Sequence, residues 1–128
     1  MALLLDTHAL LWWFDLPQAI GRSARAGIEQ EPGPVLVSSI TAFEIATRHA
    51  IGKLSGVEPL LAGFEHKLGN EGFGLLPVEV RHALAVANLP LHHRDPFDRL
   101  LIAQALVDDL TLVSNETLFD RYGVRRLW

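Results

Sequence analysis

Short runs of apolar and β-branched residues that end abruptly in polar residues recur along the chain. The three clearest runs occupy residues 2–5, 35–37 and 111–113. An unbroken run of this length is typical of a strand buried on both faces, as in a parallel sheet, because a strand with one face in water alternates apolar and polar residues. Residues 73–78 and 124–128 are two weaker strand candidates, the first of which contains Gly74 and Pro77.

Stretches with helical character separate these runs. They cover residues 9–14, 23–29, 40–51, 59–68, 79–87 and 97–108. Strands that alternate with helices of this length predict right-handed crossovers and an α/β sandwich around a mostly parallel sheet. The 128 residues show no repeat, linker or change of composition. We therefore expect a single domain over residues 1–128, long enough to bury a real core.

Polar side chains gather where the predicted strands end. The residues that emerge there are Asp6, Ser38, Ser39, Ser114, Asn115 and Glu116. Ligands of open parallel sheets bind outside the carboxyl ends of the strands, so this edge is the expected site. Asp6 is equally suited to cap the helix that follows it, and Glu116 is suited to the first turn of a short helix over 117–122 that Asn115 caps.

A third acid, Glu44, lies inside the helix predicted over residues 40–51, which Ser39 is placed to cap. At 3.6 residues per turn, the apolar arc of this helix includes Phe43 and Ile51, and Glu44 falls at the margin of that arc. Glu44 also stands four residues before Arg48, the spacing of an ordinary helical ion pair. The residues alone therefore do not decide whether Glu44 is a metal ligand or one half of a surface ion pair.

The segment Asp95-Pro96-Phe97-Asp98 has the pattern of a helix start, with Asp95 as the N-cap and proline at the first helical position. The helix that follows is apolar nearly all round, and Asp98 shares a face with Ile102 and Ala105. A carboxylate in such surroundings is costly to ionise unless a cation compensates. We therefore expect Asp98 to be a metal ligand and Asp95 to be mainly a cap.

The composition narrows the chemistry that these acids can support. The chain has no cysteine, which excludes disulfides, thiolate metal sites and cysteine nucleophiles. The six histidines are scattered, and the adjacent pair His92 and His93 point apart on regular structure, so they predict no zinc site. Clustered carboxylates without such partners favour a hard cation, Mg²⁺ or Mn²⁺.

The net charge of −4 has the wrong sign for a simple nucleic-acid binder. If five of the acids belong to one metal pocket, however, the rest of the surface is close to neutral. The location of the acids therefore decides whether the charge of the chain permits nucleic-acid binding. No apolar run approaches the about 20 residues that span a bilayer, and the N-terminal residues do not resemble a secretory signal. We expect a cytoplasmic protein without membrane contact.

Six segments together resemble a known family. They are residues 3–12, 38–46, 52–54, 93–105, 112–114 and 122–124. The block Asp-Pro-Phe-Asp-Arg-Leu-Leu-Ile-Ala-Gln-Ala at residues 95–105, with Asp6 at a strand end and Glu44 inside a helix, resembles the PIN-domain ribonucleases. Among these it is similar to the VapC-type toxins of bacterial toxin–antitoxin pairs, and the similarity runs nearly end to end.

The resemblance implies a three-layer α/β/α fold, a dimer and a Mg²⁺- or Mn²⁺-dependent endoribonuclease that hydrolyses RNA phosphodiester bonds. It also implies a cognate antitoxin that occludes the active site. By matching positions, the family's acids fall on Asp6, Glu44 and Asp98, with Asp95 as an additional acid of this subgroup.

At one position the chain departs from the family. After its last core strand the family usually carries Thr-x-Asp, whereas this chain has Ser114-Asn115-Glu116, so the fourth metal ligand implied is a glutamate. We favour a water-mediated contact between Glu116 and the metal. Thr7 and Ser114 are expected to orient a carboxylate or to bind metal-bound water. RNA is expected to approach over the arginines nearest the acids, which are Arg48, Arg94 and Arg99.

Large aromatic residues also predict self-association. They are Trp12, Trp13, Phe14 and Trp128, more aromatic surface than one small core readily hides. Two alternatives to a nuclease toxin stay open at this point. One is a PIN nuclease that processes RNA without an antitoxin, and the other is a non-enzymatic binding module whose acids are helix caps.

Overall fold

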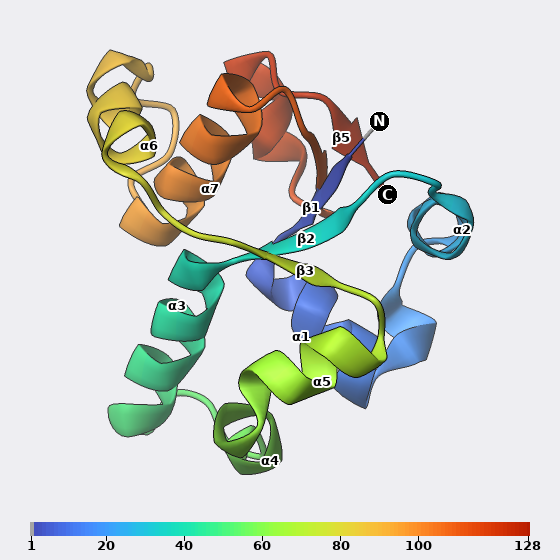
Figure 1. The fold of residues 1–128 in the computed structure, drawn as a ribbon. Helices are drawn as coiled ribbons and strands as arrows, with labels where there is room; N and C mark the ends of the chain where they lie inside the picture. Colours follow the sequence, from blue (N-terminus) through green and yellow to red (C-terminus); the bar gives the residue numbers. More distant parts are fainter. Residues whose placement is uncertain (1) are drawn as a thin grey trace.

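The protein is built on a five-stranded sheet in which every pair of neighbouring strands is parallel (Figure 1). The computed structural model describes residues 2–128. The strand order is β3-β2-β1-β4-β5. The strands are β1 (Leu3–Leu5), β2 (Val35–Ser38), β3 (Gly74–Leu76), β4 (Thr111–Val113) and β5 (Arg126–Leu127). All five strands coincide with the runs that the sequence predicts.

Successive residues of the central strand β1 enter two different cores. Leu3 and Leu5 pack into one hydrophobic cluster, and Leu4 packs into the other. Side chains of a strand alternate between the faces of the sheet, so a strand that is apolar at every position is covered on both sides. The prediction of a sheet buried between two layers of helices is therefore confirmed.

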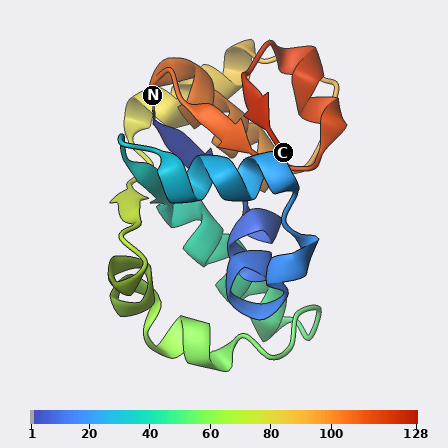
Figure 2. The ribbon, with the colours of Figure 1, turned by 90° about the vertical axis from the view of Figure 1, so that its right-hand side faces the viewer.

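Seven α-helices and three short 3₁₀ helices are assigned to the described residues. The α-helices are α1 (Thr7–Asp15), α2 (Arg22–Gln30), α3 (Ser39–Ala50), α4 (Glu58–Ala62), α5 (Phe64–Asn70), α6 (Val80–Ala85) and α7 (Pro96–Val107). The 3₁₀ helices are η1 (Pro17–Ala19), η2 (Val86–Asn88) and η3 (Thr117–Tyr122). Helix α7 covers one face of the sheet, and α1 and α5 lie on the other (Figure 1). Figure 2 shows α2 in front of the sheet.

Several boundaries differ from the predicted ones. The single helix predicted over 59–68 is two helices, α4 and α5, because the chain leaves helical geometry at Gly63 (φ −136°). The predicted helix over 79–87 tightens into η2 after Ala85. The N-cap of α3 is Ser38, whose hydroxyl accepts from the Ile40 N–H at 3.0 Å, and not Ser39.

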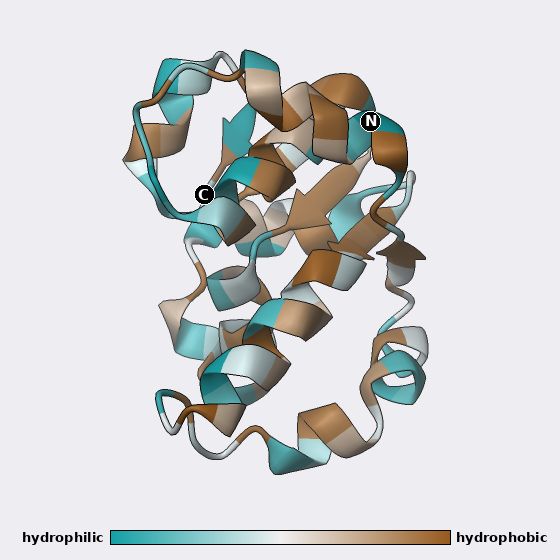
Figure 3. Cartoon of the chain, turned by 90° about the vertical axis from the view of Figure 1, so that its left-hand side faces the viewer, coloured by the Kyte–Doolittle hydropathy of each residue, from teal (hydrophilic) through white to brown (hydrophobic). Residues whose placement is uncertain are grey.

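The buried face of α3 is not the one that its apolar pattern predicts. Thr41, Glu44 and Ile45 are buried, whereas Phe43 and Ile51 are 59% and 61% exposed. Helix α3 lies against α1, α4 and α7. These neighbours cover the face that carries Thr41, Glu44 and Ile45, and they leave much of the apolar arc exposed. Figure 3 shows that hydrophobic residues alternate with hydrophilic ones along the helices.

The four large aromatic residues do not form an exposed patch. Trp12, Trp13, Phe14 and Trp128 are partly buried and pack against the core that contains Leu3 and Leu5. The argument for self-association from these side chains therefore has no support in the structure. Among residues 2–128, no helix is long and apolar enough to cross a membrane.

Candidate active site

The strand order determines where the functional side chains meet. From β1 the chain proceeds to β2 and β3 on one side, and β4 pairs with β1 on the other. The carboxyl ends of β1 and β4 therefore flank the point where the strand order reverses, which is where ligands bind in such sheets. Asp6 directly follows β1, and Ser114 directly follows β4.

Asp6 is a buried carboxylate with two roles in the fold. Its side chain is the N-cap of α1 and accepts from the Ala9 N–H at 2.8 Å. The residue is 5% exposed, and this burial raises the pKa of its carboxyl, although a hydrogen bond from Ser114 opposes the increase. Asp6 therefore caps α1 and is at the same time buried in the site.

Glu44 comes to the same place from the middle of α3. It is 4% exposed and accepts hydrogen bonds from the Thr7 hydroxyl at 2.6 Å and from Arg48 Nε at 2.8 Å. The predicted pair between Glu44 and Arg48 is therefore present, but it is buried at its acidic end instead of lying on the surface. Thr7 holds the carboxylate in one orientation, as expected.

Asp95 is the N-cap of α7 and Asp98 lies in the first turn of this helix, and the surroundings of the two carboxylates differ. Asp95 Oδ1 accepts from the Phe97 and Asp98 N–H groups at 2.8 and 3.2 Å, and its Oδ2 lies 3.3 Å from Arg48 Nη2. Asp98 Oδ2 lies 2.7 Å from His93 Nε2. Burial raises the pKa of Asp98 to about 6, and the nearby negative charges of Asp95 and Glu44 contribute to this increase while His93 opposes it.

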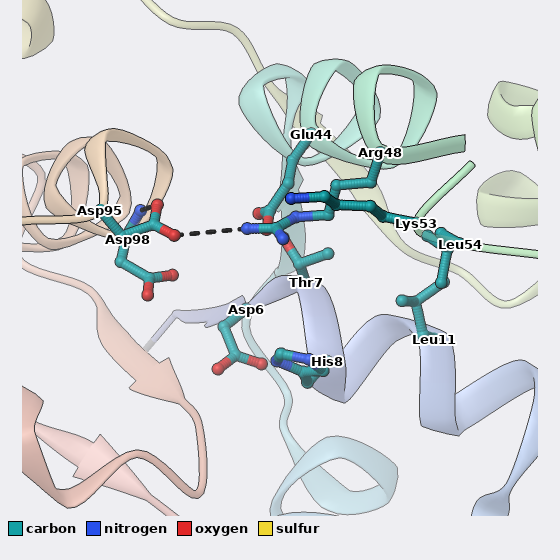
Figure 4. A pocket seen from close by; sticks show the side chains of 10 residues that line it. All are labelled: Asp6, Thr7, His8, Leu11, Glu44, Arg48, Lys53, Leu54, Asp95 and Asp98. Atoms are coloured by element: carbon teal, nitrogen blue, oxygen red, sulfur yellow. Dashed lines mark hydrogen bonds and ion pairs between the residues drawn. The ribbon is translucent and has the colours of Figure 1, made fainter. Parts of the chain in front are cut away.

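Two adjoining pockets open at these carboxylates. The first, of about 190 Å³, is lined by Asp6, Thr7, His8, Leu11, Glu44, Arg48, Lys53, Leu54, Asp95 and Asp98 (Figure 4). The second, of about 200 Å³, is lined by Asp6, His8, Trp12, Asp98, Asn115, Glu116 and Phe119. Asp6 and Asp98 line both pockets, so this pair lies at the centre of the site, with Glu44 and Glu116 on different sides of it.

The family model described as "PIN domain" matches residues 3–125 of the chain. The chain belongs to the PIN domain family. No curated protein matches the sequence.

Solved structures with the same fold extend the comparison. This PIN domain is similar to a chain of VapBC2 from Rickettsia felis bound to a promoter DNA fragment, with a TM-score of 0.74, 16% identity and coverage of 98% of this chain and 97% of that chain. DNA-bound VapBC from Salmonella typhimurium gives a TM-score of 0.74 at 19% identity, with coverage of 98% and 96%. FitAcB from Neisseria gonorrhoeae gives 0.59 at 18% identity, with coverage of 97% and 95%.

The acids of the PIN domain's site differ in whether an arginine already neutralises their charge. Among residues 2–128, no three His, Asp or Glu side chains form a group arranged to hold a metal ion. Glu44 and Asp95 are paired with Arg48. Within the described part of the chain Asp6 and Asp98 have no Arg or Lys partner, and burial raises the pKa values of both. Two carboxylates that are buried or half-buried and are not neutralised by Arg or Lys fit a hard divalent cation.

Glu116 lies apart from the other acids of the PIN domain. It lines the second pocket with Asp6 and Asp98. Its side chain caps η3 by accepting from the Leu118 N–H at 3.2 Å, so Glu116, and not Asn115, is the N-cap. Its own N–H donates to the Ser114 hydroxyl at 3.0 Å. Ser114 thus connects Glu116 to Asp6, and the metal role of Glu116 stays a prediction.

The three predicted RNA-binding arginines have different positions. Arg48 lines the first pocket, and Arg94 is exposed and lines neither of the two pockets. The guanidinium of Arg99 donates to the carbonyls of four residues in the segment that precedes α7, and its role in RNA binding stays a prediction. These acceptors are Val86, Leu89, Pro90 and His93.

Sequence reasoning did not place two of the site's residues. His93 contacts Asp98, and its position five residues earlier, outside α7, gave no regular spacing to detect it. Lys53 lines the first pocket; its place after Gly52 at the end of a predicted helix and within the family-like segment 52–54 was the available signal. Asp95 lies in the pocket as well as in its predicted cap position.

Proposed function

We propose that this PIN domain is a Mg²⁺- or Mn²⁺-dependent endoribonuclease and the toxin of a toxin–antitoxin pair. The observation that carries the nuclease proposal is the central pair of carboxylates, Asp6 and Asp98. Asp6 is buried and Asp98 half-buried at the carboxyl edge of a parallel sheet, both line the same two pockets, and burial raises the pKa values of both. Hydrolysis of a phosphodiester uses a cation at such a place.

A divalent cation held there supplies a water of lowered pKa and neutralises charge on the phosphoryl oxygens. Asp6 and Asp98 would hold it, with Glu44 and Glu116 as the wider predicted ligand set. Ser114 and Thr7 fix the orientations of the Asp6 and Glu44 carboxylates through hydrogen bonds. His93 holds one oxygen of Asp98, so the side chain approaches the pocket from a fixed direction.

The toxin proposal rests on the comparisons and on an uncovered apolar surface. The solved structures that this fold matches include VapBC complexes bound to DNA, and their likeness supports a cognate antitoxin for this chain. A mostly apolar groove of about 330 Å³ lies between α3, α4, α5 and β3, lined by Ser39, Ala42, Ala46, Leu61, Phe64, Glu65 and Leu75. Exposed apolar surface of this kind is typical of a protein-binding face.

A second candidate is favoured by a specific observation. Asp6, Asp95 and Glu116 each cap a helix through their side chains, as they would in a binding module without catalytic activity. The two functions differ in metal binding, because a set of caps binds Mn²⁺ no better than any acidic surface. A stoichiometric Mn²⁺ site measured by calorimetry, and lost in Asp6→Asn, supports the nuclease.

Cleavage of RNA by the purified protein tests the proposal directly. We expect hydrolysis of single-stranded RNA with Mn²⁺ or Mg²⁺, no hydrolysis in EDTA and none by Asp6→Asn. Asparagine is as good an N-cap as aspartate, so the variant should keep its fold, with a melting temperature in EDTA at least as high as that of the parent. The exposed Asp15→Asn is the matched control and should cleave as the parent does. Full activity of Asp6→Asn would refute the assignment of Asp6.

The partners are tested separately. We propose that the product of an adjacent reading frame binds this chain and blocks cleavage, and that without it the chain forms a homodimer. Co-expression followed by gel filtration and an inhibition assay tests the first proposal. Sedimentation tests the second, since a species of 14.2 kDa alone at micromolar concentration would show a monomer. A nuclease that no neighbouring gene product inhibits would support RNA processing without an antitoxin.

A further inference from the structure

The end of α3 directs Lys53 into the first pocket. Gly52 adopts φ +76°, a left-handed conformation that favours glycine, and ends the helix. The Lys53 N–H then donates to the Arg48 carbonyl at 2.8 Å, which turns the chain back towards the site. As a result Lys53 and Leu54 line the pocket although they lie beyond the helix (Figure 4).

Lys53 differs from the other cation of this pocket. The guanidinium of Arg48 is bound to Glu44 and Asp95 and lies over the Phe97 ring, 5.9 Å from its centroid. The Lys53 side chain has no hydrogen-bond or ion-pair partner among residues 2–128, although four carboxylates line the same pocket. Its positive charge is therefore available to a ligand, whereas that of Arg48 is already neutralised.

We propose that Lys53 binds a backbone phosphate of the RNA next to the phosphodiester that is cleaved. The inference rests on the proposed nuclease function and assigns part of its substrate site. A lysine ammonium is a flexible point charge that suits a phosphate whose position varies with the RNA conformation. Contacts of this kind determine the register of the strand without reading its sequence.

The layout of the pocket places this phosphate away from the cleaved bond. In Figure 4, the chain at Lys53 lies on the side of the pocket opposite Asp98, and the Lys53 side chain extends from there towards the Glu44–Arg48 pair in the middle of the view. The cleaved phosphodiester must lie at Asp6 and Asp98. The phosphate at Lys53 therefore belongs to a neighbouring nucleotide. Arg99 is bound to backbone carbonyls and Arg94 lines neither pocket, so neither replaces Lys53 inside the pocket.

Binding of a single-stranded RNA to variants made in the Asp6→Asn background tests this inference. The chain has only one other lysine, Lys67, which lines neither pocket of the site and provides the matched control. We expect Lys53→Ala to weaken binding about fivefold to tenfold at low salt, and to lessen the slope of log K against log[salt] by about 0.7, the value for one phosphate on a single strand. Lys67→Ala should change neither quantity, and Lys53→Arg should restore both.

Replacing single phosphates of the RNA by neutral methylphosphonates locates the contact. With Lys53 present, one replacement beside the cleavage position should weaken binding to the extent that Lys53→Ala does, and with Lys53→Ala it should have no further effect. In the active parent background, Lys53→Ala should raise KM and leave kcat nearly unchanged.

Three results overturn the inference. They are equal affinity and salt slope for Lys53→Ala and Lys67→Ala, a sensitive phosphate at the cleaved bond itself, and additive effects of the variant and the methylphosphonate. If the parent cleaves RNA and one of these results is found, only the role of Lys53 is refuted. If the parent neither cleaves nor binds RNA, the proposed function fails together with it. Thermal denaturation of Lys53→Ala shows whether its fold is kept.

Discussion

Replacing Asp98 by asparagine should stabilise the metal-free protein at neutral pH. The pKa of Asp98 is raised to about 6 from its ordinary value of 3.8, chiefly by burial and further by the charges of Asp95 and Glu44. Above pH 6 the ionised Asp98 therefore destabilises the folded protein. Asparagine has nearly the same shape, carries no charge and can still accept the hydrogen bond from His93.

The size of the effect follows from the pKa difference. Each unit of pKa difference corresponds to about 1.4 kcal/mol, so the shift corresponds to about 3 kcal/mol at most. Since 27% of the Asp98 side chain is exposed, solvent screening reduces the expected gain to roughly 1–2 kcal/mol. Below pH 3.8 Asp98 is protonated in the folded and unfolded states, so its charge has no effect there. Between pH 3.8 and about 6 the unfolded chain loses the proton first, and the folded parent loses stability.

Urea denaturation in EDTA at pH values from 4 to 8 measures this difference. The free energies of unfolding of the parent and Asp98→Asn should agree near pH 4 and separate by roughly 1–2 kcal/mol above pH 6, with the variant more stable. Asp15→Asn, on the exposed end of α1, should follow the parent. Saturating Mn²⁺ should reverse the order, because a ligand stabilises only the protein that binds it.

A variant that is less stable than the parent at pH 7 without metal would refute the reasoning. It would mean that the Asp98 carboxylate gains more from His93 than it loses by burial. A difference that does not depend on pH would show instead that the amide changes packing, and that the charge of Asp98 has no effect on stability.

Variants at four positions test the remaining assignments, those of Asp95, Asp98, Glu116 and Arg99. Asp95→Ser keeps a cap for α7 and should retain most cleavage activity, whereas Asp98→Ser should lose it; equal losses in a cleavage assay would contradict this division of roles. Glu116→Gln should lower cleavage at least tenfold, about 1.4 kcal/mol of transition-state stabilisation, whereas Glu116→Asp should retain or improve it, with higher activity in Mn²⁺ than in Mg²⁺. Unchanged cleavage by Glu116→Gln in either metal would leave this residue only as the cap of η3. Arg99→Gln should lower the free energy of unfolding by roughly 2 kcal/mol, because four carbonyl groups lose a charged donor; an RNA-binding defect at unchanged stability would instead support its predicted role in RNA binding.

The sequence determined the sheet and one edge of the site. Strands β1, β2 and β4 are local features, because an apolar run without polar interruptions is stable only when both faces are covered. Parallel pairing then places Asp6 and Ser114, each the residue after its strand, at the same edge. The start of α7 is equally local, since Asp95 and Pro96 cap and begin the helix within one turn.

Only the tertiary structure decided which face of each helix meets the site. The apolar arc of α3 predicts that Phe43 is buried, but contacts with α1 and α7 turn Glu44 and Arg48 inward and leave Phe43 exposed. The direction of Arg99 likewise depends on carbonyls of the segment that precedes α7. A helix pattern gives the relative angles of its side chains but not the rotation of the helix about its own axis. That rotation depends on the neighbours that cover it, and those neighbours are distant in sequence.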